Sequence, residues 1–193
     1  MPTPRILAFG GALRRESFNQ KLAAIAAAGA REAGATVTLI ALRDYPLPVY
    51  DGDDEEATGL PENAKKLKAL FREHDGLLIS SPEYNSGISG ALKNAIDWVS
   101  RTETDDEPDL VCFRGKSAGL VSASPGGLGG LRGLVHVRAI LGNIGVLVLP
   151  DQVAVSKAHE AFNADGSLKD AKQAASVKNV GAALAKQLAK LLA

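Results

Sequence analysis

Five short apolar runs alternate with amphipathic helical patterns along this chain, and this alternation constrains the fold more than any other feature. The runs are 5–10, 35–42, 75–80, 117–122 and 145–149. The first run, Ile6-Leu7-Ala8-Phe9, is apolar on both faces of a strand, which is typical of parallel strands that helices cover on both sides. The pattern therefore predicts a doubly wound, five-stranded parallel sheet in a three-layer αβα arrangement, formed by a single domain over residues 1–193.

The intervening segments predict five helices. Ser17 and Gln20 have the spacing of a capping box, and Phe18, Leu22 and Ile25 follow on one helical face. A second helix is expected after Pro61, which suits a first helical position. Further helices are expected after residue 90, over 135–141 and over 168–192.

The helix after residue 90 carries one residue that its apolar stripe does not explain. Leu92, Ala95, Ile96 and Val99 lie on one face at helical spacing. Trp98 falls outside that stripe, so we expect it to be half exposed or to pack on a second subunit. The apolar circumference of the helix over 135–141 likewise indicates burial between subunits.

Composition excludes several classes of function. The 22 basic and 22 acidic side chains balance, which argues against nucleic-acid binding and against attraction to an anionic membrane. No apolar stretch approaches the length of a membrane span, and the amino terminus lacks the features of a signal peptide. The single cysteine, Cys112, is interpreted as a buried structural thiol in a reducing compartment. We therefore expect a cytoplasmic protein.

Neither a metal site nor hydrolytic chemistry is indicated by the sequence. The acidic residues between positions 51 and 56 could bind a cation, but a solvated face is the favoured interpretation. The three histidines are scattered and lack metal-ligand spacing, so no metal site is expected. No G-x-S-x-G motif is present to indicate a serine hydrolase.

Three unusual loops follow the first, third and fourth apolar runs. They are 11–17, 81–90 and 124–130. Ligands of doubly wound sheets bind beyond the carboxyl ends of the strands, near the point where the strand order reverses. The three loops are therefore expected to form one composite site.

The first of these loops has the character of a phosphate site. It offers Arg14, Arg15, Ser17 and Asn19 at the start of a helix, where unpaired N–H groups and the helix dipole favour an anion. The alternative is that Ser17 is only an N-cap and that both arginines are solvated. The strand-loop-helix context favours phosphate.

The other two loops have the character of a site for a planar ring. The middle loop combines an aromatic ring, a carboxylate, an amide and two glycines. The loop after the fourth run is rich in glycine, which suits close approach of backbone N–H groups to a ring edge, although a flexible connector is the alternative. The chain contains no strict G-x-G-x-x-G and no P-loop motif, so neither a Rossmann dinucleotide site nor a P-loop is supported.

These motifs resemble the NADPH-dependent FMN reductase family over nearly the whole chain. Residues 10–19, GGALRRESFN, are similar to the family's G-S-L-R-x-x-S-x-N phosphate loop. Residues 82–98, PEYNSGISGALKNAIDW, are similar to its P-E-Y-N-x-x-x-x-x-x-L-K-N-A-I-D-W signature, and residues 124–127, SPGG, to its third flavin loop.

The resemblance implies a flavodoxin-like fold with strand order 2-1-3-4-5, FMN as cofactor and NADPH or NADH as hydride donor. It implies small-molecule acceptors such as quinones, azo compounds, chromate or free flavin, and a homodimer or homotetramer. The implied cofactor-binding residues are Arg14, Ser17, Phe18 and Asn19 at the phosphate, Pro82, Glu83, Tyr84, Asn85 and Ser86 along the isoalloxazine, and Ser124, Pro125, Gly126 and Gly127 near its pyrimidine side. Ala12 departs from the family's serine, so we expect at most modestly weaker FMN binding.

The expected mechanism is ping-pong hydride transfer, with no side chain obliged to act as a catalytic base. Glu83 is a carboxylate within the middle motif, but the sequence does not assign it a catalytic role. A flavodoxin-like electron carrier without its own substrate is the alternative, although the balanced charge lacks the docking face that a carrier needs. A regulatory sensor of a phosphate ligand on the same fold is a third interpretation.

Overall fold

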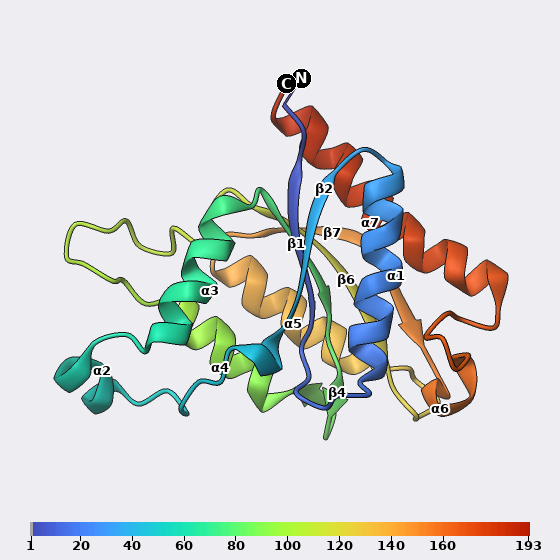
Figure 1. The fold of residues 1–193 in the computed structure, drawn as a ribbon, viewed down its shortest axis with the longest axis horizontal. Coiled ribbons are helices and arrows are strands. Elements are labelled where there is room, and N and C mark those ends of the chain that lie inside the picture. The colour runs from blue at the N-terminus through green and yellow to red at the C-terminus, as the bar shows by residue number, and fades with distance from the viewer. Residues whose placement is uncertain (1) are drawn as a thin grey trace.

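A five-stranded parallel sheet forms the centre of the computed structural model, which describes residues 2–193 (Figure 1). Its strand order is β2-β1-β3-β6-β7, which in order of the sheet strands along the chain is 2-1-3-4-5. The doubly wound sheet predicted from the sequence is therefore confirmed. The sheet strands are β1 (Arg5–Gly10), β2 (Thr36–Ala41), β3 (Gly76–Ser80), β6 (Ser117–Ala123) and β7 (Leu147–Val155); a separate hairpin contains β4 (Glu83–Tyr84) and β5 (Gly87–Ile88).

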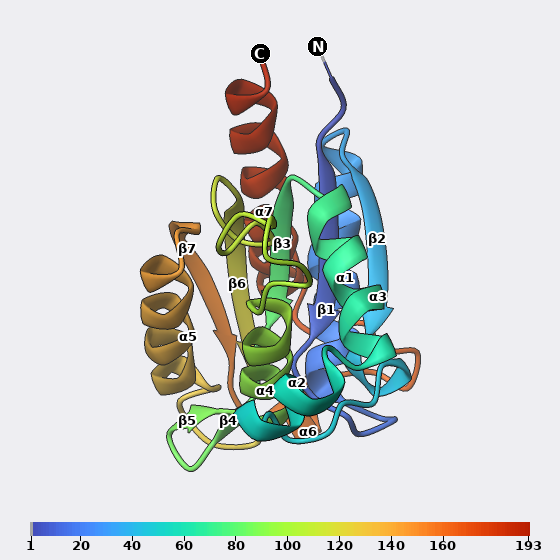
Figure 2. The ribbon, with the colours of Figure 1, turned by 90° about the vertical axis from the view of Figure 1, so that its left-hand side faces the viewer.

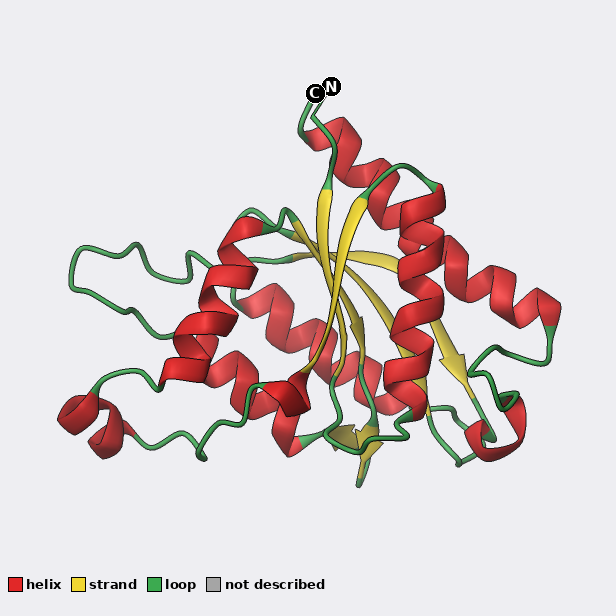
Figure 3. Ribbon diagram, in the orientation of Figure 1, coloured by secondary structure: helices red, strands yellow, loops and turns green. Residues whose placement is uncertain are grey.

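Helices cover both faces of the sheet, as Figures 2 and 3 show. Two long helices, α1 and α7, lie on one face, and α3, α4 and α5 lie on the other. The helices are α1 (Phe18–Glu32), α2 (Gly52–Thr58), α3 (Glu62–Glu73), α4 (Gly90–Val99), α5 (Leu131–Asn143), α6 (Ala158–Ala161) and α7 (Ala171–Leu191), with a 3-10 turn η1 at Leu42–Asp44.

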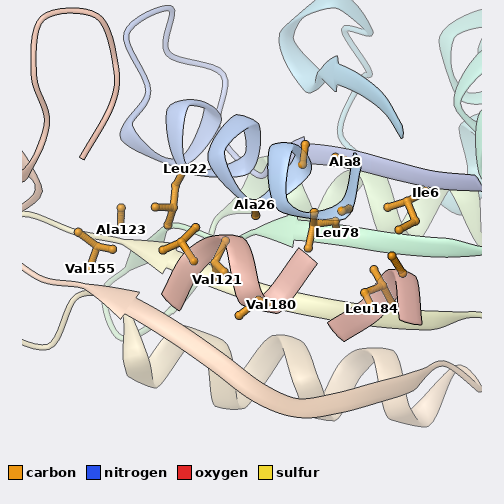
Figure 4. Close-up of a cluster of buried hydrophobic side chains, with 14 of the residues drawn as sticks. Ile6, Ala8, Leu22, Ala26, Leu78, Val121, Ala123, Val155, Val180 and Leu184 are labelled. Atoms are coloured by element: carbon orange, nitrogen blue, oxygen red, sulfur yellow. The ribbon is translucent and has the colours of Figure 1, made fainter. Parts of the chain in front are cut away.

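Each face of the sheet has its own hydrophobic core. In β1, Ile6 and Ala8 point toward α1 and α7, whereas Leu7 and Phe9 point toward the opposite layer. Figure 4 shows the first core, where Leu22 and Ala26 of α1 meet Val121 of β6. The alternation explains why the run reads as apolar throughout: both faces of this strand are buried.

The α1 and α7 helices cross at two glycines. A Cβ atom on Gly29 would stand 2.0 Å from the carbonyl oxygen of Lys178, and one on Gly181 would stand 2.0 Å from that of Ala26. Neither helix could approach the other this closely with a larger residue at these positions.

Trp98 is buried within its own chain, so the expectation of half exposure or of packing on a second subunit was wrong. Its side chain is 1% exposed, and its indole Nε1 donates to the carbonyl oxygen of Pro48 at 2.9 Å. The ring of Tyr50 meets it edge-on at 5.0 Å, and Leu60 and Ala64 complete the cluster. The segment after η1 folds back over α3 and α4. The spacing of apolar residues along α4 could not predict that long-range contact.

The last strand is longer than the sequence pattern predicted. The expected strand over 145–149 is in the structure Leu147–Val155, with an irregular register opposite residues 118 to 120. Pro150 and Asp151 lie within this irregularity and interrupt the apolar pattern. An edge strand tolerates such residues because only one side of it pairs with a neighbour.

Several helix ends also differ from the prediction. The helix expected over 135–141 spans Leu131–Asn143, and the terminal helix expected over 168–192 spans Ala171–Leu191. Ser17 caps α1 by accepting from the N–H of Gln20 at 3.3 Å. The Gln20 side chain does not complete a capping box; it bonds instead to the N–H of Gly10 and the carbonyl oxygen of Ile40.

The acidic residues at 51–56 lie in and before α2 and are exposed, except for Glu55. Glu55 accepts from the hydroxyl of Tyr50 at 2.8 Å and from Nε of Arg101 at 2.9 Å. Among residues 2–193, no three histidine, cysteine, aspartate or glutamate side chains gather into a cluster that could hold a metal ion.

A buried ion pair fastens the loop between α4 and β6 to α3. Lys68 and Glu107 are 2% and 6% exposed, with Nζ and Oε1 2.7 Å apart. The Lys68 ammonium also donates to the carbonyl oxygen of Arg101. Cys112 is buried beside this pair, as the sequence predicted, and burial raises the pKa of its thiol.

Candidate functional site

The three unusual loops meet at the carboxyl edge of the sheet. This edge lies at the end of the molecule away from the two chain termini (Figure 1). A cavity of about 210 Å³ opens there between the loops that follow β1, β3 and β6. It is lined by Ala12, Arg14, Ser17, Phe18, Asn19, Pro82, Glu83, Tyr84, Ala123, Ser124 and Pro125. The composite site predicted from the loop positions is thus a single cavity in the structure.

Hydrogen bonds tie the middle loop to the first loop and to the end of β6. Ser89 caps α4 by accepting from the N–H of Leu92 at 3.1 Å, and its hydroxyl donates to the carbonyl oxygen of Gly11 in the first loop. The hydroxyl of Ser122 donates to the carbonyl oxygen of Ser81 at 2.7 Å. Both serines are buried, so these bonds fix the spacing between the walls of the cavity.

The wall formed by the first loop has the donor set of an anion site. Arg14 uses one N–H to donate to the carbonyl oxygen of Glu16 at 2.9 Å, and its guanidinium lies 5.1 Å from the centre of the Phe18 ring. Ser17 accepts from the α1 backbone, which leaves its hydroxyl hydrogen free to donate. A fixed cation, a hydroxyl and the N-terminus of a 15-residue helix together suit a phosphate.

Asn19 lies at the base of the cavity and is only 4% exposed. Its Nδ2 donates to the carbonyl oxygen of Ala123 at 2.8 Å, and its Oδ1 accepts from the N–H of Ala123 and from the hydroxyl of Ser80, both at 2.9 Å. The amide therefore ties the start of α1 to the ends of β3 and β6. One N–H of its Nδ2 group remains for a ligand.

The middle motif forms a two-residue hairpin rather than an irregular loop. Glu83 pairs with Ile88 and Tyr84 with Gly87, and the turn residues Asn85 and Ser86 have φ angles of 51° and 67°. Two consecutive positive φ angles are typical of a type I′ turn, which matches the twist of its strands. The hairpin places Tyr84, which is 56% exposed, at the mouth of the cavity.

The Glu83 carboxylate is held by the first turn of α5. Its Oε1 accepts from Nε of Arg132 at 2.9 Å, and also from an Nη atom of the same guanidinium. Its Oε2 accepts from the N–H of Gly133 at 3.1 Å, so the carboxylate also caps α5. Burial alone would raise the pKa of Glu83, but the bonds from Arg132 and Gly133 outweigh it and hold that pKa below its usual value. Glu83 is therefore a carboxylate at neutral pH and a poor proton acceptor.

The third loop forms a further part of the cavity wall. Ser124 and Pro125 line it, and the Ser124 hydroxyl accepts from the N–H of Gly126 at 3.3 Å. Gly129 and Gly130 have positive φ angles, and a Cβ on Gly130 would stand 1.9 Å from Oγ of Ser122. The glycines thus allow the loop to lie directly on the end of β6.

The structure gathers most of the predicted site residues around the cavity. The lining among residues 2–193 includes nine of the thirteen: Arg14, Ser17, Phe18, Asn19, Pro82, Glu83, Tyr84, Ser124 and Pro125. The other four, Asn85, Ser86, Gly126 and Gly127, lie in the turn of the hairpin and in the third loop, outside that lining. Sequence reasoning missed Arg132, because nothing in the chain near position 132 indicates a partner 49 residues earlier.

Comparisons with known proteins agree with this geometry. The model of the family described as NADPH-dependent FMN reductase matches residues 4–160. An NAD(P)H-dependent FMN reductase of Pseudomonas aeruginosa is 36% identical over 169 residues, which cover 87% of this chain and 86% of that protein. A quinone reductase of Escherichia coli K12 is 36% identical over 139 residues, covering 72% of this chain and 70% of the relative.

Solved structures give the same fold. The flavoenzyme NAD(P)H:(acceptor) oxidoreductase FerB of Paracoccus denitrificans superposes with a TM-score of 0.80 at 27% identity, covering 97% of this chain and 98% of that one. An azoreductase of Bacillus anthracis superposes with a TM-score of 0.59 at 20% identity, covering 97% of this chain and all of that one. The chain belongs to the NADPH-dependent FMN reductase family of oxidoreductases.

Proposed function

We propose that this protein binds FMN in the cavity and passes a hydride from NADPH or NADH to quinones or similar small acceptors by a ping-pong mechanism. One observation carries the proposal: the anion-binding wall at Arg14 and Ser17 and the hairpin at Glu83 and Tyr84 face the same cavity in a chain of this family. Azo compounds, chromate and free flavin are included among the acceptors. A relative at 35% identity is named an NADPH azoreductase.

Different residues of the chain would hold different parts of the cofactor. Arg14, Ser17 and the N-terminus of α1 would hold the phosphate, with Asn19 and Phe18 beside them. The residues from Pro82 to Ser86 would line the isoalloxazine, and the loop from Ser124 to Gly127 would offer N–H groups near its pyrimidine side. FMN held by these residues would supply the hydride chemistry, and the chain would bind and orient it.

No side chain of the cavity is required to move a proton. Glu83 is paired with Arg132 and capped by Gly133, so it serves as a fixed element of the wall rather than as a general base. Tyr84 at the mouth borders the space in which the nicotinamide and then the acceptor would bind in turn.

The proposed partners are small molecules and a second copy of the chain. Exposed apolar side chains gather where the third loop enters α5: Leu128 is 52% exposed, Leu131 43% and Val135 59%. Their position beside the cavity supports a homodimer or homotetramer, which light scattering tests directly. Within residues 2–193, no helix combines the length and apolarity needed to cross a bilayer. Cys112 as a buried free thiol supports the proposed cytoplasmic location.

Anaerobic stopped-flow absorbance tests the proposed reaction. The FMN-loaded protein should bleach rapidly on mixing with NADPH or NADH, and a quinone added afterwards should restore the absorbance. Bleaching that requires the quinone to be present at the start would contradict the ping-pong order. A loaded protein that neither nucleotide bleaches would instead be a flavodoxin-like electron carrier.

A further inference from the structure

The ion pair of Glu83 with Arg132 joins the hairpin in the cavity wall to the first turn of α5. Glu83 belongs to the cavity wall, while Arg132 lies in the first turn of α5 outside the lining. The Glu83 side chain is 6% exposed, and that of Arg132 is 56% exposed. A largely buried carboxylate is thus compensated by a guanidinium that reaches it from the solvent side.

The negative charge of Glu83 affects how readily a cofactor bound in the cavity takes up a hydride. A hydride carries two electrons and one proton, so its uptake leaves the cavity one unit more negative. A free carboxylate in the wall would oppose that change, because like charges repel most strongly where water is excluded. A carboxylate whose charge is offset by two guanidinium N–H groups on one of its oxygens opposes it much less.

We propose that Arg132 is a positioning residue of the cofactor site, which fixes the hairpin at residues 83–88 against α5 and offsets the Glu83 charge so that the bound cofactor is more easily reduced. The inference rests on the proposed FMN function and adds to it a residue that controls the reduction potential. Arg132 acts through Glu83 and not by contact with the reacting atoms.

Only a few ionisable groups face Glu83 from the elements around it. The first turns of α5 present Arg132 and His136, whose Nδ1 lies 3.8 Å from where a Cβ on Gly87 would stand. Tyr84 follows Glu83 in the hairpin itself, β5 contributes Gly87 and Ile88, and the 124–130 loop contains no ionisable side chain. Without the Arg132 side chain, Glu83 would keep only backbone N–H donors from the first turn of α5, and burial would raise its pKa above that in the wild type.

The test compares the dissociation constants of oxidised and reduced FMN in four variants. The variants are Arg132→Met, Arg132→Lys, the double variant Glu83→Gln with Arg132→Met, and Lys186→Met, which removes an exposed positive charge from α7. Fluorescence titration gives the dissociation constant of oxidised FMN. The midpoint potential of the bound FMN, measured against a reference dye, gives the ratio of the oxidised to the reduced dissociation constant. Both are measured from pH 5.5 to 8.5.

We expect Arg132→Met to lower the ratio of oxidised to reduced dissociation constants by roughly tenfold at pH 8, because one uncompensated negative charge then faces the reduced cofactor at an effective dielectric of about 20. Tenfold corresponds to about 30 mV for a two-electron couple. The loss should diminish toward pH 5.5 as Glu83 takes up a proton. The double variant should remove both the loss and its pH dependence, Arg132→Lys should restore part of the ratio, and Lys186→Met should match the wild type.

Several results would overturn the inference. If Arg132→Met weakens the binding of oxidised and of reduced FMN equally at every pH, the arginine only supports the hairpin. The Glu83 charge then has no effect on the reduction of the cofactor. If the pH dependence persists in the double variant, it belongs to His136 and not to Glu83. A wild-type protein that takes up no FMN overturns the proposed function and this inference with it, whereas normal FMN binding with an unchanged ratio overturns the inference alone.

Discussion

Arg14 lies in the wall of the cavity, as expected for the anion contact predicted from the sequence. The strand-loop-helix context predicted an anion contact, and the guanidinium lies in the cavity wall on the ring of Phe18 with one N–H bonded to the backbone. Stacking and the backbone bond both limit its freedom, so little side-chain entropy remains to be lost when a phosphate binds.

Replacing Arg14 with alanine should raise the dissociation constant of FMN by about 10- to 150-fold. A hydrogen bond to a charged group contributes roughly 1.5–3 kcal/mol, and each 1.4 kcal/mol is tenfold in affinity. Flavin fluorescence quenching measures the constant. Arg15→Ala is the matched control, because Arg15 is exposed, lies next in the chain and is outside the cavity lining. Equal losses in the two variants would mean that only the overall positive charge of the loop matters.

At the residue scale, the sequence could predict which side chains gather but not what each one bonds to. Asn19 was predicted as a phosphate ligand, and the structure shows most of its amide bonded to Ala123 and Ser80. Glu83 belongs to the middle motif of the sequence, but its partner Arg132 is brought near only by the packing of the hairpin on α5. Contacts over such separations follow from tertiary structure and leave no local pattern.

The crossing of α1 and α7 leaves no room for a side chain at its two glycines. Gly181→Ala would place a methyl group 2.0 Å from the carbonyl oxygen of Ala26, so the helices would have to separate. Overpacking of this kind destabilises by about 1–3 kcal/mol, and urea unfolding should show a loss of that size or larger. Gly142→Ala in α5 is the control: no atom lies within 4 Å of the new methyl group, and we expect no loss or a gain of up to about 1 kcal/mol. A neutral Gly181→Ala would refute the close crossing.

The buried pair of Lys68 and Glu107 is the contact that fastens the 101–116 loop to α3. Lys68→Met leaves the Glu107 carboxylate buried without its cation, and we expect a loss of about 3–5 kcal/mol in the free energy of unfolding at pH 7. Lys65→Met on the same helix removes only an exposed pair with Glu62 and should change stability by less than about 0.5 kcal/mol.

The pH dependence of that loss has a definite sign. Burial acts to raise the pKa of Glu107, but the bond from Lys68 and the N–H of Glu103 outweigh it, so in the folded protein the pKa is lowered. The pair therefore stabilises fully above the unfolded pKa of about 4.3, and its contribution is lost as the pH falls through the lower folded value. Urea unfolding should show the difference between wild type and Lys68→Met shrinking in that acid range; a difference constant from pH 7 to pH 3 would contradict the assignment.

At the element scale, periodicity was a good guide wherever burial alone decides the pattern. The strands β1, β3 and β6 are buried on both faces, and their apolar runs predicted them closely. The pattern failed where another part of the chain supplies the cover. Trp98 lies off the stripe of α4 because the segment around Pro48 and Tyr50 covers it, and β7 continues past Pro150 because it is an edge strand.

At the scale of the whole molecule, the fold determines where the chemistry can occur. The parallel strands all end at one edge, so the loops after β1, β3 and β6 must meet there in any sheet of order 2-1-3-4-5. The sequence could therefore predict a composite site before any side chain was placed. The family to which the chain belongs accounts for the identity of the proposed cofactor, which the cavity shape alone does not determine.

The absorbance spectrum of the purified protein, saturated with FMN and then desalted, shows whether the cavity holds FMN. We expect a flavin band to remain with the protein at a stoichiometry of about one FMN per chain, because the phosphate and the ring are each held by a separate wall of the cavity. The band should be much weaker in Arg14→Ala treated in the same way. A colourless wild-type protein after desalting would rule out FMN binding in the cavity and favour a sensor of another phosphate ligand on the same fold.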